Sequence, residues 1–253
     1  MPEESQSRQD FAMRARRDGE RLLVAVAGEL DLTTAPDLEE LLLASAPYVD
    51  LELDLAELAF IDSSGLRLLL AERERALRDG GRLLVKGAQG SVARVFSISG
   101  LDSHLEPRLP GGAPRPAHQP ELRPAADNAF AGVYAAEPPS VSAIRHLLCD
   151  WARALGIRED LVGSIGLAVS EATTNVVVHA YADEPEAGTV TVEAGLEDGM
   201  LWVKVCDEGR GMKPRPDSPG LGLGLPLIAQ MTDGFEVHEA ETGGTEVRMR
   251  FAL

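Results

Sequence analysis

The chain has 253 residues, more than one small domain needs and enough for two modest hydrophobic cores. Its formal net charge is -17, from 24 basic and 41 acidic residues. Such a surface repels phosphate backbones and anionic lipid headgroups, so we expect no direct binding to nucleic acid or membranes. We find no apolar run of about 18 residues and no apolar signal core, so composition predicts a cytoplasmic protein.

The first hundred residues alternate between strand and helix patterns. Short apolar or period-two runs predict strands, and apolar residues at helical spacing predict helices. Strands separated by helices of this length indicate right-handed crossovers, so residues 1–105 are expected to form an α/β domain with a mixed sheet. The expected strands are 21–27, 51–55 and 82–86, and the expected helices are 35–46, 64–78 and 92–98.

Residues 106–126 differ sharply in composition from both flanks. Prolines recur there at positions 107, 110, 114, 116, 120 and 124. Proline removes a backbone donor and fixes φ, so neither a helix nor a central strand is expected. We predict a linker, and a flexible chain of about 20 residues spans roughly 25 Å on average.

Residues 127–253 have a different order of elements. Helices stand before and between strands that are close enough to form hairpins. This order predicts an α+β domain, with helices on one face of a mixed sheet. The expected strands are 130–135, 189–194, 201–207, 235–239 and 246–251. The expected helices are one that follows Pro138-Pro139 and runs to Leu155, and those at 159–181 and 223–231.

Three segments of this second region carry polar or glycine patterns. In the segment AVSEATTNVVVHAY, Glu171, Asn175 and His179 stand four residues apart and share one face of a helix. A polar stripe on an otherwise apolar helix is costly unless it is solvated or bound to a ligand. Asp207 ends the apolar strand LWVKVC, and GLGLGLPLIAQ places glycines directly before a helix. Glycines there let backbone amides approach a phosphate.

The order and spacing of these segments resemble the nucleotide-binding boxes of the ATPase superfamily of gyrases, histidine kinases and MutL-type proteins. Glu171 and Asn175 resemble its N box. Asp207, Gly209 and Gly211 resemble its first glycine box, and Gly220, Gly222 and Gly224 resemble the second. Gly243-Gly244-Thr245 resembles its closing Gly-Thr signature. The resemblance covers about 128–253 and implies a Bergerat-type ATP-binding sandwich.

Within that superfamily, EAxxNxxxHAY is similar to the motif of anti-sigma-factor serine kinases of the RsbW and SpoIIAB type. The resemblance implies a protein that binds a sigma factor, phosphorylates a small antagonist protein and commonly dimerises. Glu171 would be the general base, because a serine hydroxyl is a poor nucleophile at neutral pH. Asn175 would ligate Mg²⁺, and Asp207 would accept a hydrogen bond from the adenine amino group.

The same resemblance assigns further residues of the second region. Gly209 and Gly211 would shape the adenine pocket, Gly222 and Gly224, with Gly220 in the same box, would line the phosphates, and Thr245 would lie near the adenine. His179 either belongs to the nucleotide site or simply ends its helix. Arg145 either faces a partner or is an ordinary solvated arginine.

Two features of the second region bear on rival interpretations. The segment between the glycine boxes, 210–219, is short and rich in proline, and the superfamily uses it as a lid over ATP. The departure puts nucleotide retention in doubt more than the chemistry. A histidine kinase is the rival of the same fold, but no helical hairpin with an acceptor histidine precedes the domain, and His146 lies on the domain's own first helix.

The first region carries its own motif in FIDSSGLRLLL, where Asp62, Ser63 and Ser64 stand at the start of a helix. Taken alone, these residues predict N-capping. Together with VAGELDLTTAPDLEELL upstream and SVARVFSISGLD downstream, they resemble a STAS domain of the anti-sigma-factor antagonist family over about 10–105. The resemblance implies phosphorylation of Ser63, with Ser64 as the second choice, and Asp31 beside that serine.

Two families that usually form separate chains are thus fused. We expect a serine kinase and anti-sigma factor joined to an antagonist-type domain, with ATP and Mg²⁺ as cofactors and a sigma factor or STAS antagonist as partner. A tethered acceptor has an effective concentration in the mM range, so Ser63 is open to modification in cis or in trans. The alternative is a binding module in which ATP is a structural ligand and both domains are docking surfaces.

Overall fold

The computed structural model describes residues 11–99, 129–181, 188–209, 223–240 and 243–253. The expected linker, the segment 210–219 and three predicted site residues lie outside these ranges, namely Gly211, Gly220 and Gly222. The chain divides into two compact units, Met1–Ala117 and His118–Leu253, and each is described here by itself.

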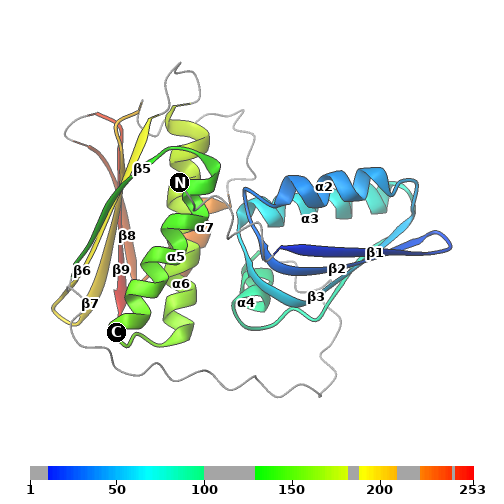
Figure 1. Ribbon diagram of the computed structural model, residues 1–253, viewed down its shortest axis with the longest axis horizontal. Helices are drawn as coiled ribbons and strands as arrows, with labels where there is room; N and C mark the ends of the chain where they lie inside the picture. Colours follow the sequence, from blue (N-terminus) through cyan, green and yellow to red (C-terminus); the bar gives the residue numbers. More distant parts are fainter. Residues whose placement is uncertain (1–10, 100–128, 182–187, 210–222, 241–242) are drawn as a thin grey trace. The chain divides into compact units, whose positions relative to one another are not determined.

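The sheet of the first unit has the order β1-β2-β3-β4 (Figure 1). Its strands are β1 (Ala12–Asp18), β2 (Arg21–Leu30), β3 (Asp50–Ile61) and β4 (Leu83–Lys86). The hairpin partner β1 runs antiparallel to β2, whereas β2, β3 and β4 are parallel. This mixed sheet confirms the predicted α/β class of the domain.

Helix α2 (Ala35–Ala44) connects β2 to β3, α3 (Ser63–Arg78) connects β3 to β4, and α4 (Gly90–Ile98) follows β4. The helices α2 and α3 lie side by side over the sheet (Figure 1). The core between helices and sheet consists mainly of aliphatic side chains with almost no exposed surface. These include Leu22, Val24, Leu38, Leu42, Leu51, Leu53, Leu66, Leu69 and Val85.

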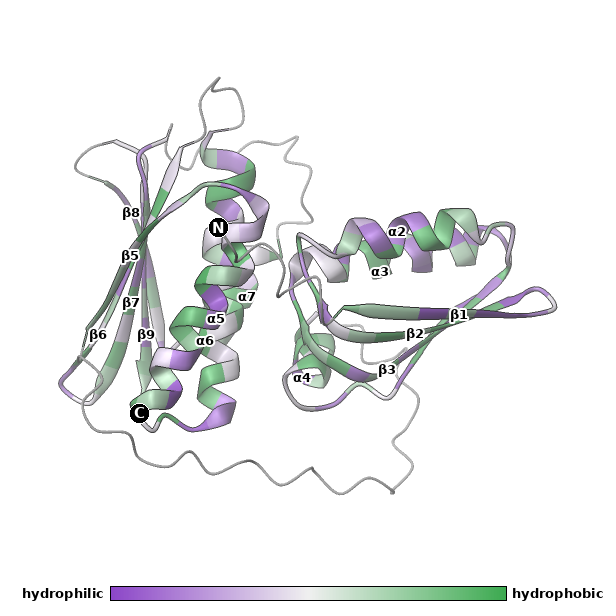
Figure 2. Cartoon of the chain, in the orientation of Figure 1, coloured by the Kyte–Doolittle hydropathy of each residue, from purple (hydrophilic) through white to green (hydrophobic). Residues whose placement is uncertain are grey.

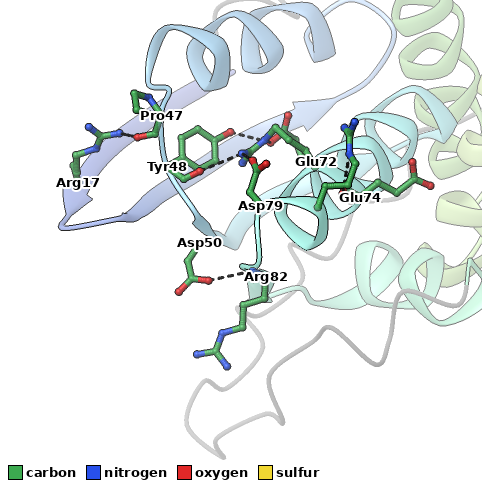
Figure 3. Close-up of polar contacts among 10 residues, drawn as sticks. Arg17, Pro47, Tyr48, Asp50, Glu72, Glu74, Asp79 and Arg82 are labelled. Carbon is green, nitrogen blue, oxygen red and sulfur yellow. Dashed lines mark hydrogen bonds and ion pairs between the residues drawn. The ribbon is translucent and has the colours of Figure 1, made fainter.

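Polar contacts hold the segment before β3 to helix α3 (Figure 3). The hydroxyl of Tyr48 donates a hydrogen bond to Glu72 Oε2 (2.8 Å), and Arg75 Nε donates to the same oxygen (2.8 Å). The guanidinium carbon of Arg75 lies 4.0 Å from the centre of the Tyr48 ring, a cation–π arrangement. Burial and the neighbouring Glu72 raise the pKa of the Tyr48 phenol, so the phenol stays a neutral donor.

The sheet of the second unit has the order β5-β6-β7-β9-β8, and every neighbouring pair is antiparallel. Its strands are β5 (Ala129–Ala135), β6 (Thr189–Glu197), β7 (Met200–Asp207), β8 (Gly234–Glu239) and β9 (Thr245–Ala252). The expectation of a mixed sheet is therefore wrong, because all four strand pairs are antiparallel and two of them, β6–β7 and β8–β9, are hairpins. The turn Asp198-Gly199 has positive φ at both residues, as a two-residue hairpin of type I′ requires.

Helices cover one face of this second sheet (Figure 1). They are α5 (Pro138–Ala154), α6 (Glu159–Asn175) and α7 (Gly224–Met231), and a π-turn, η2 (Val176–Ala180), extends α6. Figure 2 shows hydrophobic and hydrophilic residues mixed along α5, as expected for a helix with one buried face. Along β7, side chains alternate between buried and partly exposed, so one face of the sheet packs on the helices.

Helix α6 forms the centre of the second core, and most of its 17 residues are buried. By length and composition alone, the segment Glu159–Ala180 could cross a membrane, which the sequence reading did not anticipate. However, 78% of that apolar window is buried inside the protein. A helix that is apolar on nearly all sides is also what the core of a globular domain requires.

Candidate functional site

Helix α6 and the start of α7 bring two of the sequence motifs together. Glu171 is 1% exposed and Asn175 lies one turn further along α6, partly exposed. Gly224 is the first residue of α7, and a Cβ built on it would lie 3.0 Å from Glu171 Oε2 and 3.5 Å from Asn175 Oδ1. The two side chains therefore border the helix start that the second glycine box leads into.

A second group of residues gathers around Asp207, the last residue of β7. Its side chain is 3% exposed, and Oδ1 accepts a hydrogen bond from the Gly209 amide (2.9 Å). Thr245, at the start of β9, donates to Asp207 from both its backbone and its hydroxyl. Burial raises the pKa of the Asp207 carboxyl above its ordinary value, and these hydrogen bonds oppose part of that rise.

Glycines allow three backbone segments to meet at Asp207. A Cβ at Gly209 would overlap the carbonyl of Ala180, which ends η2. Gly244 has a φ of 86°, and a Cβ there would overlap the backbone carbonyl of Asp207. Only glycine permits these approaches without displacing backbone. The end of the α6–η2 helix, the end of β7 and the turn before β9 thus form one structural unit.

Arg145 and His179, both predicted as site residues, differ in their exposure to solvent. Arg145 is only 2% exposed, and its Nη1 donates to Ser170 Oγ on α6 (3.1 Å). The phase of α5 turns Ile144, Arg145 and Leu148 toward the interior, so the interpretation of Arg145 as an ordinary solvated arginine is wrong, and its partner-facing role stays a prediction. His179 is exposed on η2.

The sequence reading missed the role of Tyr181, which follows η2. Its hydroxyl donates to the carbonyl of Thr189 (2.8 Å) and accepts from the amide of Glu208 (3.0 Å). The sequence signal was its place as the last residue of the EAxxNxxxHAY motif, at the end of a helix. The contact partners lie 8 and 27 positions further along the chain, so local patterns could not find them.

In the first unit, Ser63 and Ser64 begin helix α3, with exposures of 8% and 6%. Asp62 is the N-cap, and its Oδ1 accepts from the amides of Ser64 (2.7 Å) and Gly65 (3.2 Å). The capping interpretation is therefore correct for Asp62. The Ser64 hydroxyl accepts a hydrogen bond from Arg67 Nη2 (3.1 Å).

Asp31 and Asp62 bind the backbone on either side of these serines. Asp31 Oδ1 accepts from the amides of Thr33 (2.9 Å) and Thr34 (3.3 Å), and Asp62 Oδ2 accepts from the amide of Leu32 (3.3 Å). The two carboxylates are 2% and 1% exposed. Both carboxylates turn inward to cap backbone amides, and a role of Asp31 and Asp62 in partner binding stays a prediction.

Within the described ranges, no group of three or more His, Cys, Asp or Glu side chains could hold a metal ion. Asn175 offers a single amide oxygen. One protein oxygen combined with phosphate oxygens suits Mg²⁺, which keeps several waters and is usually bound through substrate phosphates. The residues present therefore fit Mg²⁺ brought by a nucleotide.

Family models match both units. A histidine kinase-like ATPase domain model matches residues 134–251, and the model described as "Mlab, STAS domain" matches residues 13–109. Fold and site thus define a two-domain protein, in which a STAS domain precedes an ATPase domain of the histidine-kinase-like class.

Curated relatives narrow the class of the second unit. The anti-sigma F factor of Clostridium acetobutylicum is 35% identical over 105 residues, which cover 36% of this chain and 72% of that protein. The anti-sigma F factor of Clostridium botulinum (strain Eklund 17B) is 32% identical over 102 residues, covering 36% and 71%. Through its second unit, the chain belongs to the anti-sigma F factor family.

A solved structure resembles the first unit. The crystal structure of an anti-sigma factor antagonist from Mycobacterium paratuberculosis is 30% identical and covers 39% of this chain and 87% of that chain. Its TM-score is 0.35, which is too low to add to the family match.

Proposed function

We propose that the chain is an ATP-dependent protein-serine kinase and anti-sigma factor fused to an antagonist-type STAS domain. The proposal is carried by one observation, the approach of Gly224 to both Glu171 and Asn175. This approach brings a carboxylate, an amide and a helix start together at one place in the ATPase domain. Membership of the anti-sigma F factor family supports the same reading.

Asp207 supplies recognition of the adenine base in this proposal. Its carboxylate accepts a hydrogen bond from the 6-amino group, while Thr245 and the Gly209 amide hold the carboxylate in place. The raised pKa matters because only the ionised form is a pure acceptor. Gly209 lets the Ala180 carbonyl approach the turn beside Asp207, and Gly224 keeps the start of α7 close to Glu171 and Asn175.

Phosphoryl transfer is assigned to Glu171 and Asn175. Asn175 holds Mg²⁺ through its amide oxygen, and bound Mg²⁺ supplies charge stabilisation to the transferring group. Glu171 takes the hydroxyl proton of the acceptor serine while the serine Oγ forms a bond to the γ-phosphorus of ATP. The bond from that phosphorus to the β–γ bridging oxygen breaks, and ADP leaves with the electron pair.

The proposed acceptor is Ser63, with Ser64 as the second choice. A phosphate there adds about -1.5 to -2 charges beside the carboxylates of Asp31 and Asp62. The start of α3 offsets part of the repulsion, because a helix N-terminus favours negative charge. The charge at the start of α3 therefore changes sharply, while the two carboxylates keep their capping bonds.

Partner switching follows from that change of charge. The proposed partners are a sigma factor, a STAS-domain antagonist or both, and the proposed setting is transcription regulation in the cytoplasm. We further propose a homodimer, and domains at 1–105 and 127–253 joined by the linker 106–126. No direct contact with nucleic acid or membrane is part of the proposal.

The alternative is a docking module that binds ATP without transferring phosphate. The 1% exposure of Glu171 favours it, since a base must reach its substrate. Substituting Glu171→Ala separates the two functions. If partner binding still responds to ATP in a variant that retains nucleotide, catalysis is not required for the function. If the response disappears while ATP still binds, the kinase proposal stands.

A dilution experiment tests whether the acceptor lies in the same molecule. The intact chain is incubated with Mg-ATP at concentrations spanning a hundredfold, and phosphoserine is quantified by mass spectrometry. If the fraction of chains phosphorylated per unit time does not depend on protein concentration, transfer occurs in cis. If that fraction per unit time rises in proportion to protein concentration, transfer occurs in trans. If ATP is bound but no phosphoserine forms at any concentration, the proposed kinase activity is contradicted.

A further inference from the structure

The hydroxyl of Tyr181 joins two strands beside the proposed adenine site. It donates to the carbonyl of Thr189 (2.8 Å), the first residue of β6, and accepts from the amide of Glu208 (3.0 Å). Glu208 stands between Asp207 and Gly209 in the chain. One side chain thus ties the beginning of β6 to the turn that follows β7.

The ring of Tyr181 is held in place independently of that hydroxyl. It packs against Gly188, where a Cβ would overlap the ring carbons, so a side chain there would displace the ring. The carbonyl of Gly188 in turn accepts a hydrogen bond from the Ala136 amide (2.8 Å), just after β5. Removal of the hydroxyl alone should therefore leave the packing of the ring unchanged.

Other contacts fix the same turn on both sides of Glu208. The Gly209 amide donates to Asp207 Oδ1 (2.9 Å), and Gly209 also lies against the Ala180 carbonyl. Gly244 lies against the Asp207 carbonyl. Tyr181 holds the peptide between these anchors, so its hydroxyl restricts rotation of the backbone that carries the Asp207 carboxylate.

We propose that Tyr181 is a positioning residue that aims the Asp207 carboxylate at the 6-amino group of adenine. The inference rests on the proposed ATP site and adds to it the residue that sets base selectivity. A hydrogen bond weakens steeply when its angle departs from linearity, so a small rotation of Asp207 lowers affinity for a base that carries this donor. Recognition by one fixed polar group depends on supporting hydrogen bonds around it.

The test replaces Tyr181 by Phe in the full chain and compares ATP with inosine triphosphate, which lacks the 6-amino group. Binding of each Mg-nucleotide is measured by calorimetry. We expect Y181F to weaken ATP binding about three- to tenfold, the range for one lost hydrogen bond, and to change inosine triphosphate binding little. The ratio of the two affinities should fall by the same factor. Tyr134→Phe, in β5 of the same unit, is the matched control and should leave the ratio unchanged.

Equal weakening of both nucleotides, or an unchanged ratio, would overturn the positioning role, because general loosening of the site does not distinguish the bases. A measurement without nucleotide tests the positioning role of Tyr181 separately from the proposed ATP site. Amide hydrogen exchange at Glu208 should be faster in Y181F than in the wild type, while Val203 in the middle of β7 keeps its protection. Unchanged exchange at Glu208 also overturns the inference. Wild-type protein that binds neither nucleotide would overturn the proposed function together with it.

Discussion

Gly224→Ala tests the contact between α7 and the polar face of α6. The added Cβ would lie 3.0 Å from Glu171 Oε2, and an ordinary contact to carbon begins near 3.4 Å. Glu171 is 1% exposed, so the carboxylate cannot turn freely into solvent. We expect it to shift by a few tenths of an ångström, because the backbone of Gly224 has no positive φ that would make alanine strained.

The loss of rate caused by that shift follows from the size of the displacement. A displacement of about 1 Å at a reacting group costs roughly a hundredfold in rate, so a few tenths should cost about five- to tenfold. Stability should move little, because alanine favours a helix over glycine by up to about 1 kcal/mol and the tight contact opposes that gain. The variant should therefore lose phosphotransfer rate without unfolding.

The assay compares initial rates of phosphoserine formation and thermal midpoints for the wild type and two variants. Gly234→Ala is the matched control, because a Cβ at Gly234 meets nothing within 4 Å and its φ is not positive. The control should keep the wild-type rate. A wild-type rate in G224A would refute the reasoning, since the approach of Gly224 to Glu171 would then have no bearing on transfer.

Three further predictions follow from the two units. ATP affinity, measured by calorimetric titration, should fall on acidification with a midpoint above the ordinary aspartate pKa of about 3.9, because burial raises the pKa of Asp207. Asp207→Asn should abolish this pH dependence. The same shift means that the stability contributed by Asp207 is present at acid pH and lost as pH rises through its folded pKa. Asp62→Ala should lower the free energy of unfolding by about 1–2 kcal/mol in urea, since three backbone amides lose their acceptor; an unchanged midpoint would contradict the capping role. Gly65→Ala should cost about 1–3 kcal/mol in the same assay, because its Cβ would lie 2.8 Å from both Ile61 and Leu30; full stability would show that the packing there yields easily.

Periodic segments of the sequence predicted most elements of both sheets, because their burial pattern is local. The strand β1 was missed, since Ala12–Asp18 is an edge strand whose arginines leave it almost fully exposed and without an apolar alternation. The antiparallel second sheet was also beyond local patterns. Pairing depends on which strands meet in space, and β7 pairs with β9 across an intervening helix and strand.

The candidate site was predictable to the extent that residues share a helix face or a glycine turn. Helical spacing placed Glu171 and Asn175 together, but their approach to Gly224 needed the packing of α7 on α6. Arg145 was misjudged because an arginine is normally exposed, and its burial depends on Ser170 in the neighbouring helix. Tyr181 ends the EAxxNxxxHAY motif, but that motif assigned it no role, and only its long-range hydrogen bonds indicate one.

The central claim is that the second unit transfers phosphate from ATP to a serine of the first. Mass spectrometry of the intact chain after incubation with Mg-ATP tests it most directly, with Glu171→Gln as the matched variant that keeps the size of the side chain. The account predicts phosphate on Ser63 in the wild type and none in the variant, with ATP binding retained in both. A wild-type chain that binds ATP yet carries no phosphate on Ser63 or Ser64 would contradict it.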